Sequence, residues 1–381
     1  MHPETGKTIT GKCILLISPH SWGKMFISKH HYAVELARLG NKVYFLNPPN
    51  RKLYANISIN RSEEYEGLHI IDHKLWFPYR MRYHAKGLFH FLMQWHIKKI
   101  LANLDHTADI IWSFDLNNLY PFRLFPASAC KIFHPVDEPL TQSAIEAAQG
   151  AGIIISVTQE ILQKYAGYPV PKYLINHGIS EDFLVHSSHV NNTGVIKVGF
   201  SGNLMRHDID RGTLLTIIAG NPFVIFECWG SYKKKDGNIG GDADEPTKTF
   251  VEKLQSFPNV ILHGVVTPAK LASELHRMEA FIICYDIEKD QSRGTNYHKI
   301  MEYLSTGKVI VSNNVTAYAG QPGLIVMPEE RMHNKKLPGL FTDVIRDLSF
   351  YNSKEKQEIR KQFAYQNKYS NHIKTIASFL K

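Results

Sequence analysis

Short apolar runs alternate with amphipathic stretches along most of the chain, which is the pattern of α/β proteins built on parallel sheets. The first run, residues 12–18, has the length of a buried strand. A helical pattern follows over residues 27–39, ends at Gly40 and leads into a second strand over 42–46. Further strands of this first half are predicted at residues 110–115, 131–138 and 152–157. The order strand, helix, strand indicates a Rossmann-like sheet.

The polar stretch over residues 181–194 interrupts this pattern and has the composition of a linker. The pattern then restarts, with strands predicted at 195–201, 223–229, 259–264, 281–286, 309–311 and 324–327 and helices at 335–349 and 354–380. We therefore expect an α/β protein with two Rossmann-like domains facing a cleft, over residues 1–185 and 195–365. A C-terminal helix over 366–381 is expected to pack back on the first domain.

Residues 294–314 combine a polar loop, a short helix, a glycine and a buried strand. We expect Thr295 or Asn296 to cap the helix and Gly307 to end it in a left-handed turn. Lys299 and Glu302, three residues apart, then share one helical face. A cation near a helix N-terminus suits phosphates, and a carboxylate one turn later suits sugar hydroxyls.

This segment resembles the donor-binding segment of glycosyltransferases with the GT-B fold, in particular the glycogen-synthase-like group (glycosyl transferases group 1). Its pattern is Asn-x-x-Lys-x-x-Glu-Tyr-Leu-x-x-Gly-Lys, and the matching residues are Asn296, Lys299, Glu302, Tyr303, Leu304, Gly307 and Lys308. The resemblance implies that Glu302 binds the ribose of a nucleoside diphosphate sugar and that Lys299 lies near its phosphates. Many members carry a second glutamate eight positions earlier, where this chain has Gly294.

A second donor element is predicted where the strand over 195–201 ends in Gly202 and Asn203. A glycine here allows a diphosphate to approach the backbone, and a nearby cation neutralises the charge of a leaving group. Arg206 is the nearest cation and Arg211 the next. The resemblance supports this position, since the family has Gly-x-Leu followed by a basic residue.

Two Asp-x-Asp triplets, at 208–210 and 242–244, are the only candidates for a metal-dependent transfer. Neither follows an apolar strand, and the first is placed to cap a helix beginning near Arg211. We expect no metal and no cofactor beyond the nucleoside diphosphate sugar that serves as substrate.

In the first half, polar residues follow two predicted strands, where ligands of parallel sheets bind. His20, Ser21 and Gly23 are expected to border the acceptor side of the cleft. His134 and Asp137 follow a later strand and are our catalytic candidates, because the resemblance places a histidine or aspartate there near the transferred sugar. A histidine packed in the core and an aspartate capping a turn are the alternatives.

Residues 73–104 interleave aromatic residues with cations, as interfacial membrane helices do. The net charge of +9 favours anionic partners of this kind. The alternative is a partly buried helix with a solvated basic face. Single-stranded nucleic acid also binds aromatics and cations, but no recognition module surrounds them, so we expect no nucleic-acid partner.

The function expected from the resemblance is transfer of a sugar from a nucleoside diphosphate sugar to an acceptor hydroxyl, with retention, in cell-surface polysaccharide or glycolipid synthesis. No Gly-x-Gly-x-x-Gly follows an early strand, which removes the main support for dinucleotide oxidoreduction. Scattered cysteines and the lack of a signal peptide predict a cytoplasmic protein, with a peripheral position at the inner membrane face left open. The alternatives are a sugar-nucleotide epimerase of the same fold and a non-catalytic, basic membrane- or nucleic-acid-binding protein.

Overall fold

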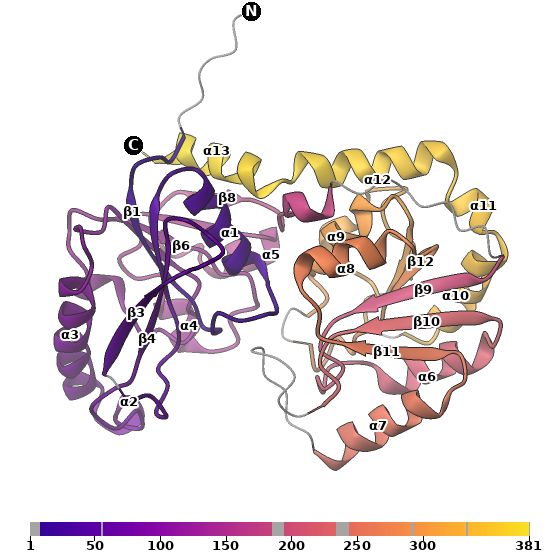
Figure 1. Cartoon of the computed structure of the whole chain (residues 1–381), viewed down its shortest axis with the longest axis horizontal. Helices are drawn as coiled ribbons and strands as arrows, with labels where there is room; N and C mark the ends of the chain where they lie inside the picture. Colours follow the sequence, from indigo (N-terminus) through magenta and orange to yellow (C-terminus); the bar gives the residue numbers. More distant parts are fainter. Residues whose placement is uncertain are drawn as a thin grey trace, which may run out of the picture. The chain divides into compact units, whose positions relative to one another are not determined.

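The computed structural model describes residues 8–54, 56–184, 194–233, 244–290, 293–332 and 334–380 (Figure 1). These residues form two compact units. Unit 1 contains Met1–Trp22, Ile27–Asn176 and Tyr369–Lys381, and unit 2 contains Gly23–Phe26 and His177–Lys368. Most of the linker predicted at 181–194 lies outside the described residues.

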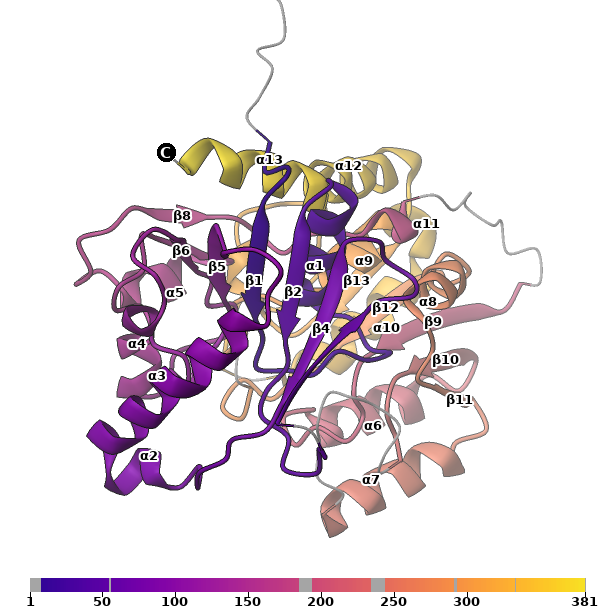
Figure 2. The same cartoon turned by 60° about the vertical axis from the view of Figure 1, so that its left-hand side comes forward.

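Unit 1 is built on an eight-stranded sheet in the order β3-β4-β2-β1-β5-β6-β7-β8. Its strands are β1 Cys13–Ile17, β2 Lys42–Leu46, β3 Ile57–Arg61, β4 Leu68–His73, β5 Ile110–Ser113, β6 Cys130–Phe133, β7 Ile153–Ser156 and β8 Lys172–Leu174. Every pairing is parallel except that of β3 with β4. The central strands β1, β2 and β4 lie side by side in Figure 2. The order reverses between β1 and β5, and ligands of such sheets bind where that reversal occurs.

Helices and short 3-10 turns complete unit 1, and they are α1 Ser28–Arg38, α2 Met81–His84, α3 Lys86–Ala102, η1 Phe122–Leu124, α4 Gln142–Glu146, α5 Gln159–Lys164 and α13 Tyr369–Phe379. The C-terminal helix α13 packs on α1, where the ring of Tyr369 meets that of Tyr32 with centroids 4.8 Å apart. At the other end of α13, Phe379 stacks on Tyr173 at 3.6 Å. The last helix of the chain is therefore part of unit 1.

Unit 2 is built on a five-stranded, fully parallel sheet in the order β11-β10-β9-β12-β13. Its strands are β9 Ile196–Ser201, β10 Val224–Trp229, β11 Val260–Gly264, β12 Ala280–Ile283 and β13 Val309–Ser312. Its helices and 3-10 turns are η2 Glu181–Phe183, α6 Arg211–Gly220, α7 Glu245–Ser256, α8 Pro268–Leu275, α9 Lys299–Ser305, η3 Thr316–Tyr318, α10 Leu337–Arg346, α11 Leu348–Tyr351 and α12 Lys354–Gln366. The strand order reverses between β9 and β12, so the carboxyl ends of these two strands mark the expected ligand site.

The expectation of an α/β protein with two Rossmann-like domains is confirmed, but several predicted elements are wrong in extent or type, among them the helix 335–349, which is divided into α10 and α11. Residues 324–327 form no strand, because only Val326 bridges to Val311 of β13. The predicted helix 354–380 is divided into α12 and α13, and the break falls where the chain passes from unit 2 to unit 1. Of the helices that the structure describes, none is long and apolar enough to cross a bilayer.

Candidate active site

The turn after β9 brings the backbones of two strands into close approach. Gly202 donates its N–H to the carbonyl of Trp229 over 2.8 Å, and a Cβ added at Gly230 would lie 1.9 Å from the Gly202 oxygen. Asn203 is buried, and its side-chain oxygen accepts the N–H of Met205 over 2.9 Å. The predicted donor residues Gly202 and Asn203 thus form a tight turn at the end of the sheet where its strand order reverses.

Helix α9 begins at Lys299, later than its predicted cap residues. The N-cap is His298, with no side-chain capping bond, and the side-chain oxygen of Asn296 accepts the N–H of Tyr297 instead. The prediction that Thr295 or Asn296 caps this helix is therefore wrong. Gly307 has φ +78°, which confirms the predicted left-handed end of the helix.

Helix α9 holds the buried carboxylate of Glu302, for which the described residues provide no hydrogen-bond donor. Its exposed fraction is 8%, and no donor in the described residues hydrogen-bonds to its carboxylate. Burial raises the pKa of Glu302 from 4.5 to about 7, although the charge of Lys299 opposes this rise. Since a buried carboxylate without hydrogen bonds is unfavourable, the site suits a ligand that supplies hydroxyl donors.

Lys299 holds its ammonium group at the turn after β9. The exposed fraction of Lys299 is 4%, and its Nζ donates to the Tyr285 hydroxyl over 2.6 Å. The same Nζ lies 5.0 Å from the ring centroid of Phe200 and 4.9 Å from that of Tyr285. A Cβ added at Gly202 would lie 2.6 Å from it. In the described residues no carboxylate forms an ion pair with Lys299, so its charge is available to an anion.

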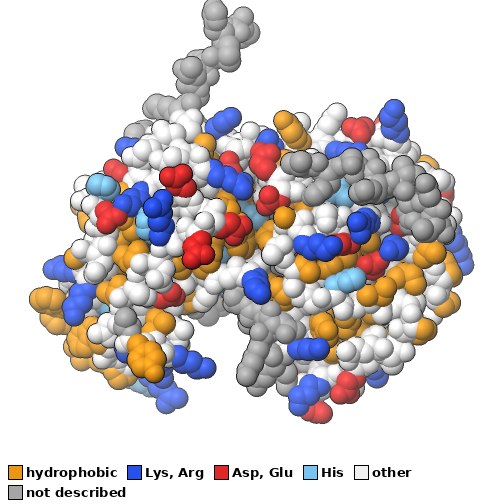
Figure 3. Space-filling model, in the orientation of Figure 1, with side chains coloured by type: hydrophobic (Ala, Val, Ile, Leu, Met, Phe, Trp, Pro, Cys, Tyr) orange, Lys and Arg blue, Asp and Glu red, His pale blue; other side chains and the backbone are white. Residues whose placement is uncertain are grey.

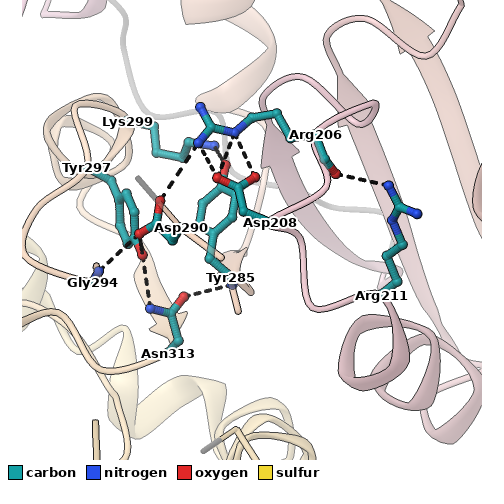
Figure 4. Close-up of polar contacts among 9 residues, drawn as sticks. All are labelled: Arg206, Asp208, Arg211, Tyr285, Asp290, Gly294, Tyr297, Lys299 and Asn313. Carbon is teal, nitrogen blue, oxygen red and sulfur yellow. Dashed lines mark hydrogen bonds and ion pairs between the residues drawn. The ribbon is translucent and has the colours of Figure 1, made fainter. Parts of the chain in front are cut away.

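Arg206, in contrast, is held by carboxylates of its own unit (Figure 4). Its Nε donates to Asp208 over 2.8 Å and 3.1 Å, and its Nη2 also contacts Asp208. The same Nη2 lies 3.8 Å from Asp290. Arg211 points elsewhere, since its guanidinium donates to the carbonyl of Arg206 and to Thr247. Lys299 is thus less compensated than Arg206.

Gly294 occupies a position that has no room for the second glutamate of the resembling family. Its φ is +68°, and an added Cβ would lie 2.9 Å from the carbonyl oxygen of Asn314. Its N–H donates over 3.0 Å to Asp290, which also accepts the Tyr297 hydroxyl over 2.7 Å (Figure 4). The departure noticed in the sequence therefore has a steric reason, and Asp290 supplies a buried carboxylate in the same loop.

In unit 1, residues after β1 form a second polar cluster. His20 Nδ1 lies 3.1 Å from Lys29 Nζ, and the Ser21 carbonyl lies 3.1 Å from His30 Nε2. Lys29 is buried on α1, and burial lowers its pKa to about 8, although Asp137 and Asp115 raise it. Of the three residues predicted beside the first strand, His20 and Ser21 belong to unit 1 and Gly23 to unit 2.

The catalytic candidates His134 and Asp137 lie in different environments after β6. His134 is buried, its Nδ1 accepts the indole N–H of Trp112 over 3.3 Å, and its ring stacks on Phe114 at 4.8 Å. Asp137 is half-buried and contributes to the charge around Lys29. Of the two, Asp137 is better placed to meet a ligand, while His134 packs among aromatic rings.

One aspartate of each Asp-x-Asp triplet caps a helix in the structure. Asp210 caps α6 by accepting the N–H of Thr213, and Asp244 caps α7 by accepting that of Thr247. Asp242 lies outside the described residues. Within the described residues no cluster of three or more potential ligands could hold a metal ion.

Sequence reasoning missed three members of these clusters, namely Lys29, Tyr285 and Asp290. The pattern assigned Lys29 to a helix and Tyr285 to a strand end, without a signal for what either would contact. Asp290 lay in a polar loop whose path is set by its bonds to Gly294 and Tyr297. The only signal in the sequence was that Lys29 falls in the apolar part of a predicted helix, where a lysine is unusual.

No family model and no curated relative matches the chain. Solved structures do match over almost its full length. They include a sucrose-phosphate synthase from Thermosynechococcus elongatus, with a TM-score of 0.70, 11% identity and coverage of 97% of this chain and 98% of that one. Anabaena Alr3699/HepE in complex with UDP and glucose matches with a TM-score of 0.65, 14% identity and coverage of 97% and 99%. The lipopolysaccharide outer core galactosyltransferase WaaB matches with a TM-score of 0.57, 12% identity and coverage of 96% and 99%. The chain therefore has the fold of the GT-B glycosyltransferases.

Proposed function

We propose that this protein is a glycosyltransferase that moves a sugar from a nucleoside diphosphate sugar to an acceptor hydroxyl. The observation that carries the proposal is the buried Glu302 carboxylate, which no donor in the described part of the chain hydrogen-bonds, one helical turn from the Lys299 ammonium, which no carboxylate there ion-pairs. Two ribose hydroxyls would supply the missing donors, and a diphosphate would supply the missing anion. A fold shared with glycosyltransferases, one of them solved with UDP and glucose, supports the same assignment.

The negative charge that develops on the departing diphosphate determines the role of each residue on the donor side. As the bond to the sugar breaks, negative charge grows on the departing diphosphate, and a fixed cation lowers the barrier by stabilising it. Lys299 takes this role, with Arg206 as a second, largely neutralised cation. The glycine turn at Gly202 and Asn203 lets the diphosphate approach the backbone, and Asn296 is a further donor-binding residue in this proposal. No metal is required by this arrangement.

The acceptor side is proposed for unit 1, around the polar residues after β1 and β6. Asp137 orients the acceptor or the transferred sugar, and His134 holds the strand end behind it. His20 and Ser21 border the acceptor, and Gly23 follows them in the chain. Retention at the anomeric carbon and a role in cell-surface polysaccharide or glycolipid synthesis are proposed from the resemblance.

Ligand-induced thermal stabilisation tests the donor assignment, because a ligand that binds the folded state raises its melting temperature with occupancy. We would screen UDP, GDP, ADP and dTDP and their sugars against the wild type and Glu302→Gln. The matched control is Glu358→Gln, which removes an exposed carboxylate of α12 in the same unit. A shift with one base that is lost in Glu302→Gln alone is expected, and no shift with any nucleotide contradicts the proposal.

Product analysis distinguishes a transferase from an epimerase of the same fold. A transferase releases free nucleoside diphosphate in proportion to acceptor turnover, whereas an epimerase converts the donor sugar without any acceptor. The identity of the sugar left on the nucleotide, measured by mass spectrometry and chromatography, separates the two.

A further inference from the structure

Five large hydrophobic side chains of unit 1 are exposed within a short segment. Their exposed fractions run from 51% for Leu88 to 62% for Tyr83. The set, here called the aromatic surface, is Trp76, Tyr83, Leu88, Phe91 and Trp95. It holds a third of all the large hydrophobic residues that are exposed in the described parts of the chain. Apolar surface concentrated in this way is typical of an interaction site.

The aromatic surface does not serve the core of unit 1. Helix α3 already buries a complete inner face, made of Phe89, Met93, His96, Ile97 and Ile100. Leu88, Phe91 and Trp95 follow at helical spacing on the outside, and the rings of Phe91 and Trp95 are 6.4 Å apart. A helix that is apolar on both faces needs a partner on the outer one.

The charged residues of the segment that carries the aromatic surface have one sign. Residues 73–104 contain no aspartate or glutamate and six cations, namely Lys74, Arg80, Arg82, Lys86, Lys98 and Lys99. Four of these are exposed, and Lys98 lies with its Nζ 5.5 Å from the ring centroid of Trp95. In Figure 3, hydrophobic and basic side chains occur together over α2 and α3. Rings with neighbouring cations match the interface of an anionic bilayer, where rings sit at the headgroups and cations meet lipid phosphates.

A pocket of about 380 Å³ in unit 1 adjoins this surface. It lies beyond the carboxyl ends of β1, β2, β4 and β5, and its lining includes Ser18, Arg51, Phe77, Tyr79, Asp115 and Tyr120. Two wall residues touch the aromatic surface, since Phe77 meets Trp76 with centroids 5.1 Å apart and Tyr79 meets Tyr83 at 6.5 Å. The wall of the pocket is therefore continuous with the aromatic surface.

From this continuity we infer that the acceptor is a membrane amphiphile. The aromatic surface lies on an anionic bilayer, and the pocket holds the polar head of an acceptor whose tail stays in the membrane. The identification of the amphiphile as an acceptor rests on the proposed glycosyl transfer, whereas binding of the protein to a membrane can be measured independently of it. Helix α3 spans Lys86–Ala102 and lies along the interface, since it is too short to cross a bilayer.

Vesicle co-sedimentation of the full chain tests the surface. Phosphatidylcholine vesicles with and without phosphatidylglycerol would be compared for the wild type, for Phe91→Ser with Trp95→Ser, and for Lys98→Glu with Lys99→Glu. The matched controls are Phe350→Ser with Tyr365→Ser, equally exposed rings of unit 2, and Lys253→Glu with Lys374→Glu, which have the same change in charge.

We expect the wild type to bind the anionic vesicles, and to bind them more weakly as salt is added. Each of the two double variants of α3 should have a partition coefficient at least tenfold lower than that of the wild type, whereas the control variants should partition as the wild type does. Absence of binding to anionic vesicles, or equal losses in the controls, overturns the inference. Binding of a single-stranded oligonucleotide without binding of vesicles overturns it in favour of nucleic acid. Self-association that the Phe91→Ser and Trp95→Ser pair abolishes, without vesicle binding, overturns it in favour of a second copy of the chain.

Saturation-transfer NMR with octyl β-glucoside and with free glucose tests the pocket. We expect the alkyl glucoside to bind more tightly than glucose, and Leu75→Trp, which fills the pocket, to weaken that binding at least tenfold while vesicle binding persists. Equal binding of both probes, or no effect of Leu75→Trp, contradicts a head-group site here. The same variants should still be stabilised by the nucleotide that stabilises the wild type. If the nucleotide fails to stabilise even the wild type, the donor assignment has failed, and that failure is distinct from a failure of the membrane inference.

Discussion

Replacing Glu302 by glutamine should stabilise the unliganded protein, and increasingly so as pH rises. Burial raises the pKa of Glu302 from 4.5 to about 7, so the folded state holds a proton that the unfolded state releases between these values. The free energy of unfolding of the wild type is therefore unaffected by Glu302 at low pH and decreases as pH rises through this window. At 1.36 kcal/mol for each pKa unit, the loss is roughly 3 kcal/mol above about pH 7.

Glutamine keeps the shape of the protonated side chain and cannot ionise, so Glu302→Gln avoids this loss. Urea unfolding of both proteins from about pH 4.5 to about pH 8 should show a free-energy difference that starts near zero and grows to roughly 3 kcal/mol. A difference that does not change with pH would refute the reasoning, because it would show that the carboxylate is not desolvated. Glu358→Gln, at an exposed carboxylate, should follow the wild type at every pH.

Glu302→Gln should also weaken binding of the nucleotide donor. A variant that is more stable without ligand but binds the ligand less tightly would identify Glu302 as a binding residue. Hydrogen bonds to a charged group contribute about 1.5–3 kcal/mol, so loss of the carboxylate should lower nucleotide affinity about 10- to 150-fold. Because the bound hydroxyls favour the ionised form, wild-type affinity should rise as pH increases toward and beyond about 7. Isothermal titration calorimetry in two buffers of different ionisation enthalpy would detect the proton released on binding, and Glu302→Gln should release none.

Three further substitutions probe other parts of the site. Lys299→Met should lower affinity for a nucleoside diphosphate by about 1.5–3 kcal/mol but leave affinity for the nucleoside unchanged, measured by calorimetry; equal losses for both would contradict a phosphate contact. Asp137→Asn should leave donor binding intact and reduce transfer about 10²- to 10⁴-fold, read from product formation; full activity would exclude the role proposed for it. Gly294→Ala should destabilise unit 2 by about 1–3 kcal/mol in urea, because φ is +68° and the added Cβ meets the Asn314 carbonyl at 2.9 Å; an unchanged midpoint would show that the loop relaxes freely.

Local patterns were sufficient for the secondary structure and the fold class. Apolar runs of strand length between glycines placed β1, β2 and β9 within a residue or two, because a buried parallel strand must be apolar on both faces. Gly307 ended α9 as expected, since only a residue tolerant of positive φ serves there. The spacing of Lys299 and Glu302 follows from the helical repeat alone, and so the sequence itself determined that a cation and a carboxylate share one face.

Tertiary contacts decided which polar groups are available for chemistry. Asp208 and Asp290 neutralise Arg206, whereas Lys299 donates to the Tyr285 hydroxyl and forms no ion pair with a carboxylate in the described residues. These partners come from separate loops, and their convergence depends on how the sheet and its connections pack. The sequence shows that such residues exist but carries no local signal for the distances between them.

The same reason accounts for the burial of His134 and the exposure of the aromatic surface. His134 follows a strand, as a catalytic histidine would, but Trp112 and Phe114 of the neighbouring strand and loop enclose its ring. Phe89 and Phe91 have the same hydrophobicity and stand two residues apart, yet one is buried and the other is 56% exposed. Because burial depends on which face of a helix meets the rest of its unit, the amino-acid sequence determined the elements and the three-dimensional packing selected the residues left to bind a partner.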